Sequence, residues 1–249
     1  YAAQSIQEAF VHLGVGYSIT TRNTRVIFWQ DSSPTGFPTG NLLTDNATDQ
    51  ENIDCAKGLS LGSTIYVALW DETNGEMELY SSTDLGVNWT AGPTTGISYG
   101  INGKAIYVDA NGDPAPCFGT GDGVWALDTS VPALVKIVDL SNAIDSNNCR
   151  GMAIGPDGLL CVPLGTGGML KVKFNGDSFD VTDVGPNRNF GLPSTKQGYV
   201  TGQMVTAEKW LFVPYGGHTT GRQASIFAFD PWANGGNGAG FRVNARSKK

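Results

Sequence analysis

The feature that most constrains the fold is an internal repeat in the middle of the chain. Residues 105–127 and 151–173 follow one pattern: a short apolar segment, a turn containing glycine, a second apolar segment ending in Gly-Thr-Gly, and a third segment that alternates. The Gly-Thr-Gly triplets at 119–121 and 165–167 are 46 residues apart. Short apolar segments between glycine turns are typical of β-strands. The repeat therefore predicts a chain built from similar β-sheet units.

The same pattern extends along the chain with more variation. Second strands are expected at 26–29, 65–70, 115–118, 160–164 and 211–215. First strands are expected upstream of them, at 17–20, 58–61, 105–108, 151–154 and 202–206. Hairpins between third and fourth strands are expected near Asp45, at 82–89, at 128–130, at 175–176 and near Pro231.

Repeats of about 40–50 residues with four strands each are typical of propeller blades. We therefore predict an all-β fold, a β-propeller of five blades with four antiparallel strands each; six blades are the alternative. One domain is expected over residues 1–249, with blades at about 14–50, 57–95, 104–140, 149–185 and 198–245.

The N-terminal residues allow two interpretations. Ser5-Ile6-Gln7-Glu8 has the order of a helix capping box, and apolar residues follow at helical spacing up to Gly14. A short helix is one prediction. The other is a strand within 10–16 that closes the ring by pairing into the last blade.

Composition restricts the function classes. The chain of 249 residues has 34 glycines and only 16% charged residues, which suits many short strands and tight turns. The net charge of −7 argues against a nucleic-acid surface, which would need clustered lysines and arginines. No apolar run reaches the roughly 18 residues of a membrane span. Neither nucleic acid nor membrane insertion is therefore expected.

No metal or other cofactor is predicted. The four cysteines, Cys55, Cys117, Cys149 and Cys161, match no zinc spacing. Burial of the thiols is favoured, with one or two disulfides as the alternative. Residues 109–113 begin like a calcium loop, but Pro114 stands where glycine is needed, and no glutamate follows at the twelfth position. A plain hairpin turn is expected there.

One octapeptide, Ser82-Thr83-Asp84-Leu85-Gly86-Val87-Asn88-Trp89, fits the pattern Ser-x-Asp-x-Gly-x-x-Trp. Ser82 and Asp84 can accept backbone hydrogen bonds within a turn, Gly86 allows a positive φ, and the Trp89 ring can cover the hairpin. This octapeptide resembles the Asp box of sialidase-like (BNR-repeat) β-propellers. In that family the box lies on blade-edge hairpins remote from the catalytic centre, so the resemblance implies an architecture and not an activity.

The resemblance does not extend to sialidase catalysis. The family carries three arginines for the substrate carboxylate, a Tyr–Glu nucleophile pair, a loop aspartate and an Arg-Ile-Pro motif. This sequence has no Arg-Ile-Pro, and at most Arg150, Arg188 and Arg222 fall on the loops expected near the channel. Sialidase activity is not predicted.

Ligand binding is expected at the mouth, the end of the propeller where the loops between second and third strands meet those between blades. Trp29 and Trp70 end equivalent predicted strands, and each precedes an aspartate, a pairing that suits sugar stacking and hydroxyl recognition. Packing between blades is the competing interpretation of both tryptophans. The candidate ligand-binding residues are Trp29, Asp31, Trp70, Asp71, Asp122, His218 and Arg222.

The function expected from these features is a non-catalytic recognition or structural module. Its composition resembles extracellular and virion-surface proteins, including phage capsid, tail and receptor-binding components. Its partner would be a glycan or another protein chain of a larger assembly. The alternative is a glycoside hydrolase in which Asp31, Asp71 and Asp122 converge at the mouth. No catalytic residue is assigned.

Overall fold

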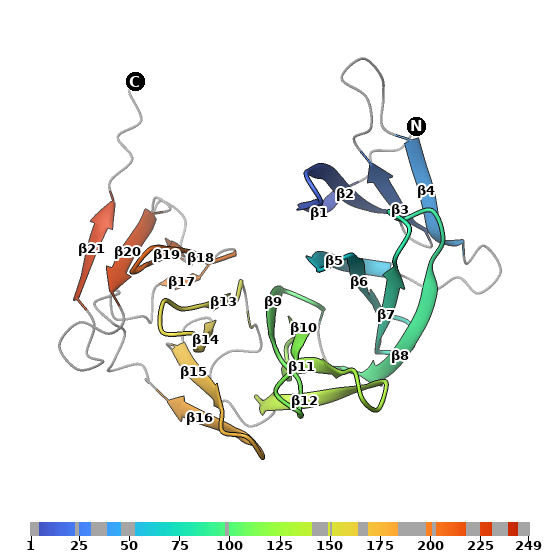
Figure 1. Ribbon diagram of the computed structural model, residues 1–249. Helices are drawn as coiled ribbons and strands as arrows, with labels where there is room; N and C mark the ends of the chain where they lie inside the picture. The colour runs from blue at the N-terminus through green and yellow to red at the C-terminus, as the bar shows by residue number, and fades with distance from the viewer. Residues whose placement is uncertain are drawn as a thin grey trace, which may run out of the picture.

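The chain is described here by a computed structural model. The described residues are 5–22, 25–30, 39–45, 53–97, 100–140, 149, 151–163, 169–183, 198–200, 203–217, 225–230 and 239–243. Over these residues the chain forms 21 β-strands and no helix, and none of them lies in a helix that could cross a membrane. The strands form five antiparallel sheets that follow one another around an arc (Figure 1).

The first three sheets are four-stranded meanders. Sheet 1 contains β1 (Ser5–His12), β2 (Val15–Arg22), β3 (Arg25–Gln30) and β4 (Thr39–Asp45). Sheet 2 contains β5 (Ile53–Leu61), β6 (Thr64–Asp71), β7 (Glu76–Ser82) and β8 (Thr90–Gly96). Sheet 3 contains β9 (Gly103–Val108), β10 (Pro114–Gly119), β11 (Gly123–Asp128) and β12 (Ala133–Asp139).

The last two sheets follow the same plan. Sheet 4 contains β13 (Ala153–Ile154), β14 (Leu160–Pro163), β15 (Met169–Phe174) and β16 (Phe179–Asp183). Sheet 5 contains β17 (Gly198–Val200), β18 (Val205–Ala207), β19 (Trp210–Gly217), β20 (Ser225–Asp230) and β21 (Ala239–Val243), and both β17 and β18 pair with β19. In sheets 2 to 5 the predicted second strands are confirmed over the described residues, and so are the predicted hairpins of sheets 2 to 4. The hairpin predicted near Pro231 lies outside the described residues, and the strands on either side of it, β20 and β21, pair with each other.

The sheets are oriented alike, which gives the molecule two distinct ends. His12 at the end of β1 contacts Ser60 near the end of β5, and Thr206 in β18 donates a hydrogen bond to the carbonyl of Ile154 at the end of β13. The turns between second and third strands and the connections between sheets therefore share one end, here called the mouth end. The hairpins between first and second and between third and fourth strands share the other, here called the turn end.

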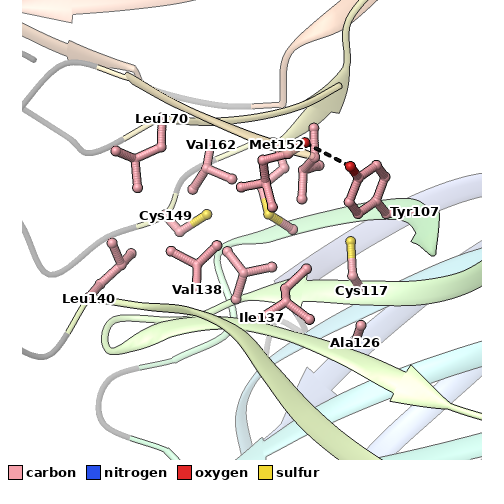
Figure 2. Close-up of a cluster of buried hydrophobic side chains, with 13 residues drawn as sticks. Tyr107, Cys117, Ala126, Ile137, Val138, Leu140, Cys149, Met152, Val162 and Leu170 are labelled. Carbon is pink, nitrogen blue, oxygen red and sulfur yellow. Dashed lines mark hydrogen bonds between the residues drawn. The ribbon is translucent and has the colours of Figure 1, made fainter. Parts of the chain in front are cut away.

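The hydrophobic core is divided among the junctions of successive sheets. One cluster joins sheets 1 and 2, and a second joins sheets 2 and 3 around the fully buried Phe118. A third joins sheets 3 and 4, where side chains from both sheets interdigitate around Met152 (Figure 2). At that junction the Tyr107 hydroxyl donates to the Val172 carbonyl at 2.7 Å and accepts from the Phe174 N–H at 3.0 Å.

In sheet 1 the predicted strand order is wrong by one strand. The N-terminal residues form β1 and pair with β2, so they form neither a helix nor a strand that closes the ring. Phe10 and His12 turn inward while Val11 and Leu13 are exposed, which is the two-residue period of a strand. Residues 26–29 therefore lie in the third strand, and Asp45 ends the fourth strand instead of marking a hairpin.

Three cysteines are buried free thiols: Cys117, Cys149 and Cys161. Burial raises the pKa of Cys117 and Cys161 to about 12 and that of Cys149 well above its usual value. The favoured interpretation, structural burial, is confirmed for these three. The side chain of Cys55 lies outside the described part of the chain.

Candidate functional site

Asp71 lies at the mouth end, where β6 turns into β7. Its side chain is fully buried, and its carboxylate accepts hydrogen bonds from the Thr73 N–H at 2.8 Å and the Asn74 N–H at 3.1 Å. The Asn74 side-chain amide donates a third hydrogen bond at 2.7 Å. Such local bonds are the usual way in which aspartate stabilises a tight turn. The geometry assigns Asp71 to holding its own turn.

Trp70 precedes Asp71 and packs into the junction of sheets 2 and 3, in the cluster around Phe118. Its indole Nε1 is buried without a hydrogen-bond partner. Trp29 is not its structural equivalent, because Trp29 lies in the third strand of sheet 1 and pairs with Ser18 and Gly40. β3 ends at the turn end and β6 at the mouth end, so the predicted aromatic pair does not form at one end.

Asp122 lies in the neighbouring mouth-end turn, between β10 and β11. It accepts a hydrogen bond from the Thr120 hydroxyl at 2.6 Å and pairs with Lys136 of β12 at 3.0 Å. Lys136 also lies over the Trp125 ring, 4.8 Å from the centroid, and 3.7 Å from Asp139. Asp122 thus joins the turn to the outer strand of its sheet.

A series of backbone hydrogen bonds links sheets 3, 4 and 5 at the mouth end. The Asn102 N–H donates to the Gly119 carbonyl at 2.8 Å, and the Asn102 carbonyl accepts from the Gly151 N–H at 3.3 Å. The Gly151 carbonyl in turn accepts from the Met204 N–H at 2.9 Å. The Gln203 amide adds hydrogen bonds to the carbonyls of Met152 and Lys104. Sequence reasoning missed these residues, because each bond joins segments far apart in the chain.

Sequence reasoning also missed a charged cluster on the first strands of sheets 1 to 3. Glu8 lies 3.2 Å from Lys104 and 3.6 Å from Lys57. Lys104 donates to the Gly58 carbonyl and lies over the Phe10 ring. Burial lowers the pKa of Lys104, although the charge of Glu8 acts in the opposite direction. The cluster connects the first strands of three sheets. Within it the Lys104 ammonium has Glu8, the Gly58 carbonyl and the Phe10 ring as partners.

The Ser82–Trp89 hairpin joins β7 to β8 at the turn end. The Ser82 hydroxyl donates to Asp84 at 2.8 Å and accepts from the Gly86 N–H at 2.9 Å. Asp84 accepts from both the backbone and the side-chain amide of Asn88, at 2.9 and 2.7 Å. These bonds lower the pKa of Asp84 to about 2. Trp89 packs into the junction of sheets 1 and 2.

The hairpin at 109–113 is a plain turn, as predicted. Asp109 is buried, and its carboxylate accepts from the N–H groups of Asn111 and Asp113 at 2.8 and 3.0 Å and from Thr129. Burial would raise the pKa of Asp109, but these hydrogen bonds hold it below its ordinary value. Among the described residues, no group of three or more His, Cys, Asp or Glu side chains is arranged to hold a metal ion.

The remaining candidates lie outside the described residues. They are Asp31, which follows β3 in the sequence, and His218 and Arg222, which follow β19. A ligand-binding role for these three side chains, and for the side chain of Trp29, stays a prediction.

Comparison with solved structures supports the propeller fold. The structure of YCF48 bound to D1 peptide matches with a TM-score of 0.50 and 12% sequence identity, over 90% of this chain and 64% of that chain. The chain thus spans about two thirds of that protein's length. At this identity the likeness shows the fold alone. No protein-family model matches the sequence, and no curated protein does.

Two further solved structures match with lower scores. One is a GH43 glycoside hydrolase with endo-xylanase and exo-arabinofuranosidase activity, with 11% identity and a TM-score of 0.46 over 99% of this chain and 56% of that one. Another is a luciferin-regenerating enzyme, with 10% identity and a TM-score of 0.46 over 88% and 78%. At a TM-score of 0.46 neither match supports a functional inference. The chain is a β-propeller protein.

Proposed function

We propose that this chain is a non-catalytic recognition or structural module that binds its partner through loops at the mouth end. The proposal rests on what the two described candidate carboxylates at that end do: both stabilise turns of the scaffold. Asp71 is fully buried in its own turn, and Asp122 is held by Thr120 and Lys136. Glycoside hydrolysis requires two carboxyl groups facing one pocket, one as acid and one as nucleophile or base. Residues that stabilise a scaffold fit a binding module better.

The module's partner is a glycan or a neighbouring protein chain of a larger assembly. A protein partner agrees with the structure of YCF48 bound to D1 peptide, in which the peptide is bound by YCF48 and not by this chain. The acidic, lysine-poor composition fits an extracellular or virion surface, such as a phage-like capsid, tail or receptor-binding component. The contacts of Ser82, Asp84 and Gly86 support membership of the sialidase-like Asp-box superfamily.

The glycoside hydrolase is the alternative function. It needs Asp31, Asp71 and Asp122 to converge, yet β3, the strand before Asp31, ends at the turn end. Asp71 and Asp122 belong to mouth-end turns of sheets 2 and 3. The orientation of β3 therefore favours the non-catalytic function.

The test is a glycan-array screen of the full chain together with hydrolysis assays on the same sugars. Binding without product release would support a glycan-binding module, and His218→Ala and Arg222→Ala should then weaken binding. Release of sugar that disappears in Asp71→Asn or Asp122→Asn would establish the hydrolase instead. If neither binding nor hydrolysis occurs, the partner is a protein chain, to be sought by crosslinking within the assembly.

A further inference from the structure

The turn end carries exposed apolar side chains at the tips of three hairpins. Leu13 lies between β1 and β2, Leu85 and Val87 between β7 and β8, and Val131 between β11 and β12 (Figure 1). Their exposed fractions are 68, 40, 65 and 65% respectively. At the mouth end, the apolar side chains of Ile97, Ile101 and Leu140 are buried. The three hairpins belong to successive sheets, so their tips share one end of the molecule.

The two leucines have a backbone conformation that leucine does not favour. Leu13 has a φ of 48° and Leu85 a φ of 63°, and each is followed by a glycine with positive φ. Two successive positive φ values are the pattern of type I′ turns, for which Asn-Gly is the preferred sequence. Leucine in this region is strained by its Cβ. Neither turn preference nor core packing explains a leucine that is both strained and exposed, which points to a contact outside the chain.

The turn end is acidic overall. The exposed acidic side chains of its described turns are Asp84 and Asp113 on sheets 2 and 3 and Asp157, Asp177 and Glu208 on sheets 4 and 5, against one basic residue, Lys209. Asp84 lies next to Leu85 and, with a pKa of about 2, is negatively charged at neutral pH. A second copy of this chain would bring acidic turns against acidic turns. A partner with positive charges beside its apolar groups would complement the surface instead.

We propose that Leu13, Leu85, Val87 and Val131 form a docking surface for a basic segment of another protein, one that places aliphatic side chains between lysines or arginines. This surface is separate from the mouth-end site proposed above and does not depend on it. The aliphatic groups of the partner cover the tips, and its cationic groups pair with Asp84 and the neighbouring acidic turns. Leucine is retained at the two strained positions because its side chain supplies the contact.

The test uses a synthetic amphipathic peptide with one leucine face and one lysine face, titrated into the full chain by isothermal calorimetry. A matched peptide with glutamate in place of lysine is the control ligand. The basic peptide should bind more weakly as salt is raised, and the acidic peptide should not bind. Leu13→Asn and Leu85→Asn should each weaken binding about fivefold or more, while their urea midpoints stay equal to or above that of the wild type. Asparagine suits the left-handed turn, so loss of folding cannot explain a loss of binding.

Val181→Thr is the control variant, because Val181 is exposed on β16 away from the hairpin tips. It should bind the basic peptide like the wild type. The proposal is overturned if the basic peptide fails to bind, if both peptides bind equally, or if the two leucine variants retain full affinity. Concentration-dependent dimerisation that Leu13→Asn abolishes would also overturn it, since the occupant would then be a second copy. None of these outcomes bears on the glycan or hydrolysis assays of the mouth end.

Discussion

The mouth end and the turn end are stabilised in different ways. At the mouth end, the strands and connections of neighbouring sheets pack closely: a Cβ at Gly119 would lie 2.4 Å from the Cys149 sulfur, and one at Gly103 would lie 2.8 Å from the Cys149 carbonyl oxygen. At the turn end, Gly14 and Gly158 have positive φ and no atom within 4 Å of an added Cβ. Contacts between sheets therefore fix the start of β9 and the end of β10 at the mouth end, whereas local turn chemistry fixes the hairpins of Gly14 and Gly158 at the turn end.

This difference bears on where function can vary. Turns that pack against neighbouring sheets cannot change without disturbing the core, and Asp122 belongs to such a turn, because the Thr120 carbonyl accepts from the Cys149 N–H at 3.5 Å. Isolated hairpin tips can change their side chains at small cost to the fold. The exposed leucines of the turn end fit that freedom.

Glycine substitution should separate the two ends most strongly. Gly103→Ala forces a Cβ to 2.8 Å from the Cys149 carbonyl oxygen, across the junction of sheets 3 and 4, and should lower the free energy of unfolding by about 3 kcal/mol. Gly158→Ala has open space and only a positive φ of 79° to strain, and should cost about 1 kcal/mol. Urea unfolding of both variants measures the contrast. Equal losses would contradict the comparison.

Tyr107 is a point where the turn end is tied between two sheets. Tyr107→Phe removes the hydroxyl that bridges the Val172 carbonyl and the Phe174 N–H, and should lower the free energy of unfolding by about 1–3 kcal/mol. Tyr80→Phe is the matched control, since the Tyr80 hydroxyl donates to the nearby Glu78 within one strand. We expect a smaller loss for this control in the same urea titration. An equal loss in the two variants would mean that the bridge between sheets contributes no more to the free energy of unfolding than a hydrogen bond within one strand.

His12 should make the junction of sheets 1 and 2 sensitive to pH. It is buried, its Nδ1 lies 2.7 Å from the Ser60 hydroxyl oxygen, and its Nε2 has no partner. Burial lowers its pKa below 6.5, so the folded state disfavours the protonated ring, and stability should fall as the pH drops below about 6.5. Urea midpoints between pH 7 and 5 should fall less steeply in His12→Leu than in the wild type. His218→Ala, which changes the only other histidine, should keep the wild-type slope.

Asp84→Ala should have the smallest effect on stability, because the contacts of Asp84 lie within its own hairpin. Its folded pKa of about 2 lies below the ordinary value of 3.8, so its stabilising contribution is present above about pH 4 and is lost as the pH falls toward 2. Asp84→Ala should lower the urea midpoint at pH 7 and reduce the difference between pH 6 and pH 3. Glycan binding at the mouth end should be unchanged. Selective loss of glycan binding in a folded Asp84→Ala protein would refute the placement of this hairpin away from the mouth.

Local patterns predicted most of the fold. The 46-residue repeat placed the strands of sheets 2 to 4 and most of those of sheet 5, because glycine turns and apolar segments mark them directly; the extra strand β17 of sheet 5 was not expected. Sheet 1 was displaced by one strand, since residues 6, 10 and 13 also fit a helical stripe and the partner strand that decides between the two lies farther along the chain. That displacement made Trp29 seem equivalent to Trp70.

The candidate site was less predictable. The positions of Asp71 and Asp122 at the mouth end followed from the repeat, but their bonds within the turns did not. The Glu8–Lys57–Lys104 cluster could not be predicted, because its three residues are about fifty positions apart in the sequence and no local pattern connects them. Contacts of this kind depend on how the sheets pack.

Amide hydrogen exchange of the full chain compares the two ends most directly. The N–H groups of Leu140 and Met204 donate to Asp122 and Gly151 at 2.8 and 2.9 Å and belong to buried residues of the mouth end. They should exchange slowly, near the rate set by global unfolding. The N–H groups of Asn88 and Ser178, on exposed hairpins of the turn end, should exchange much faster. Equal protection at the two ends, or faster exchange at Leu140 and Met204, would contradict the account.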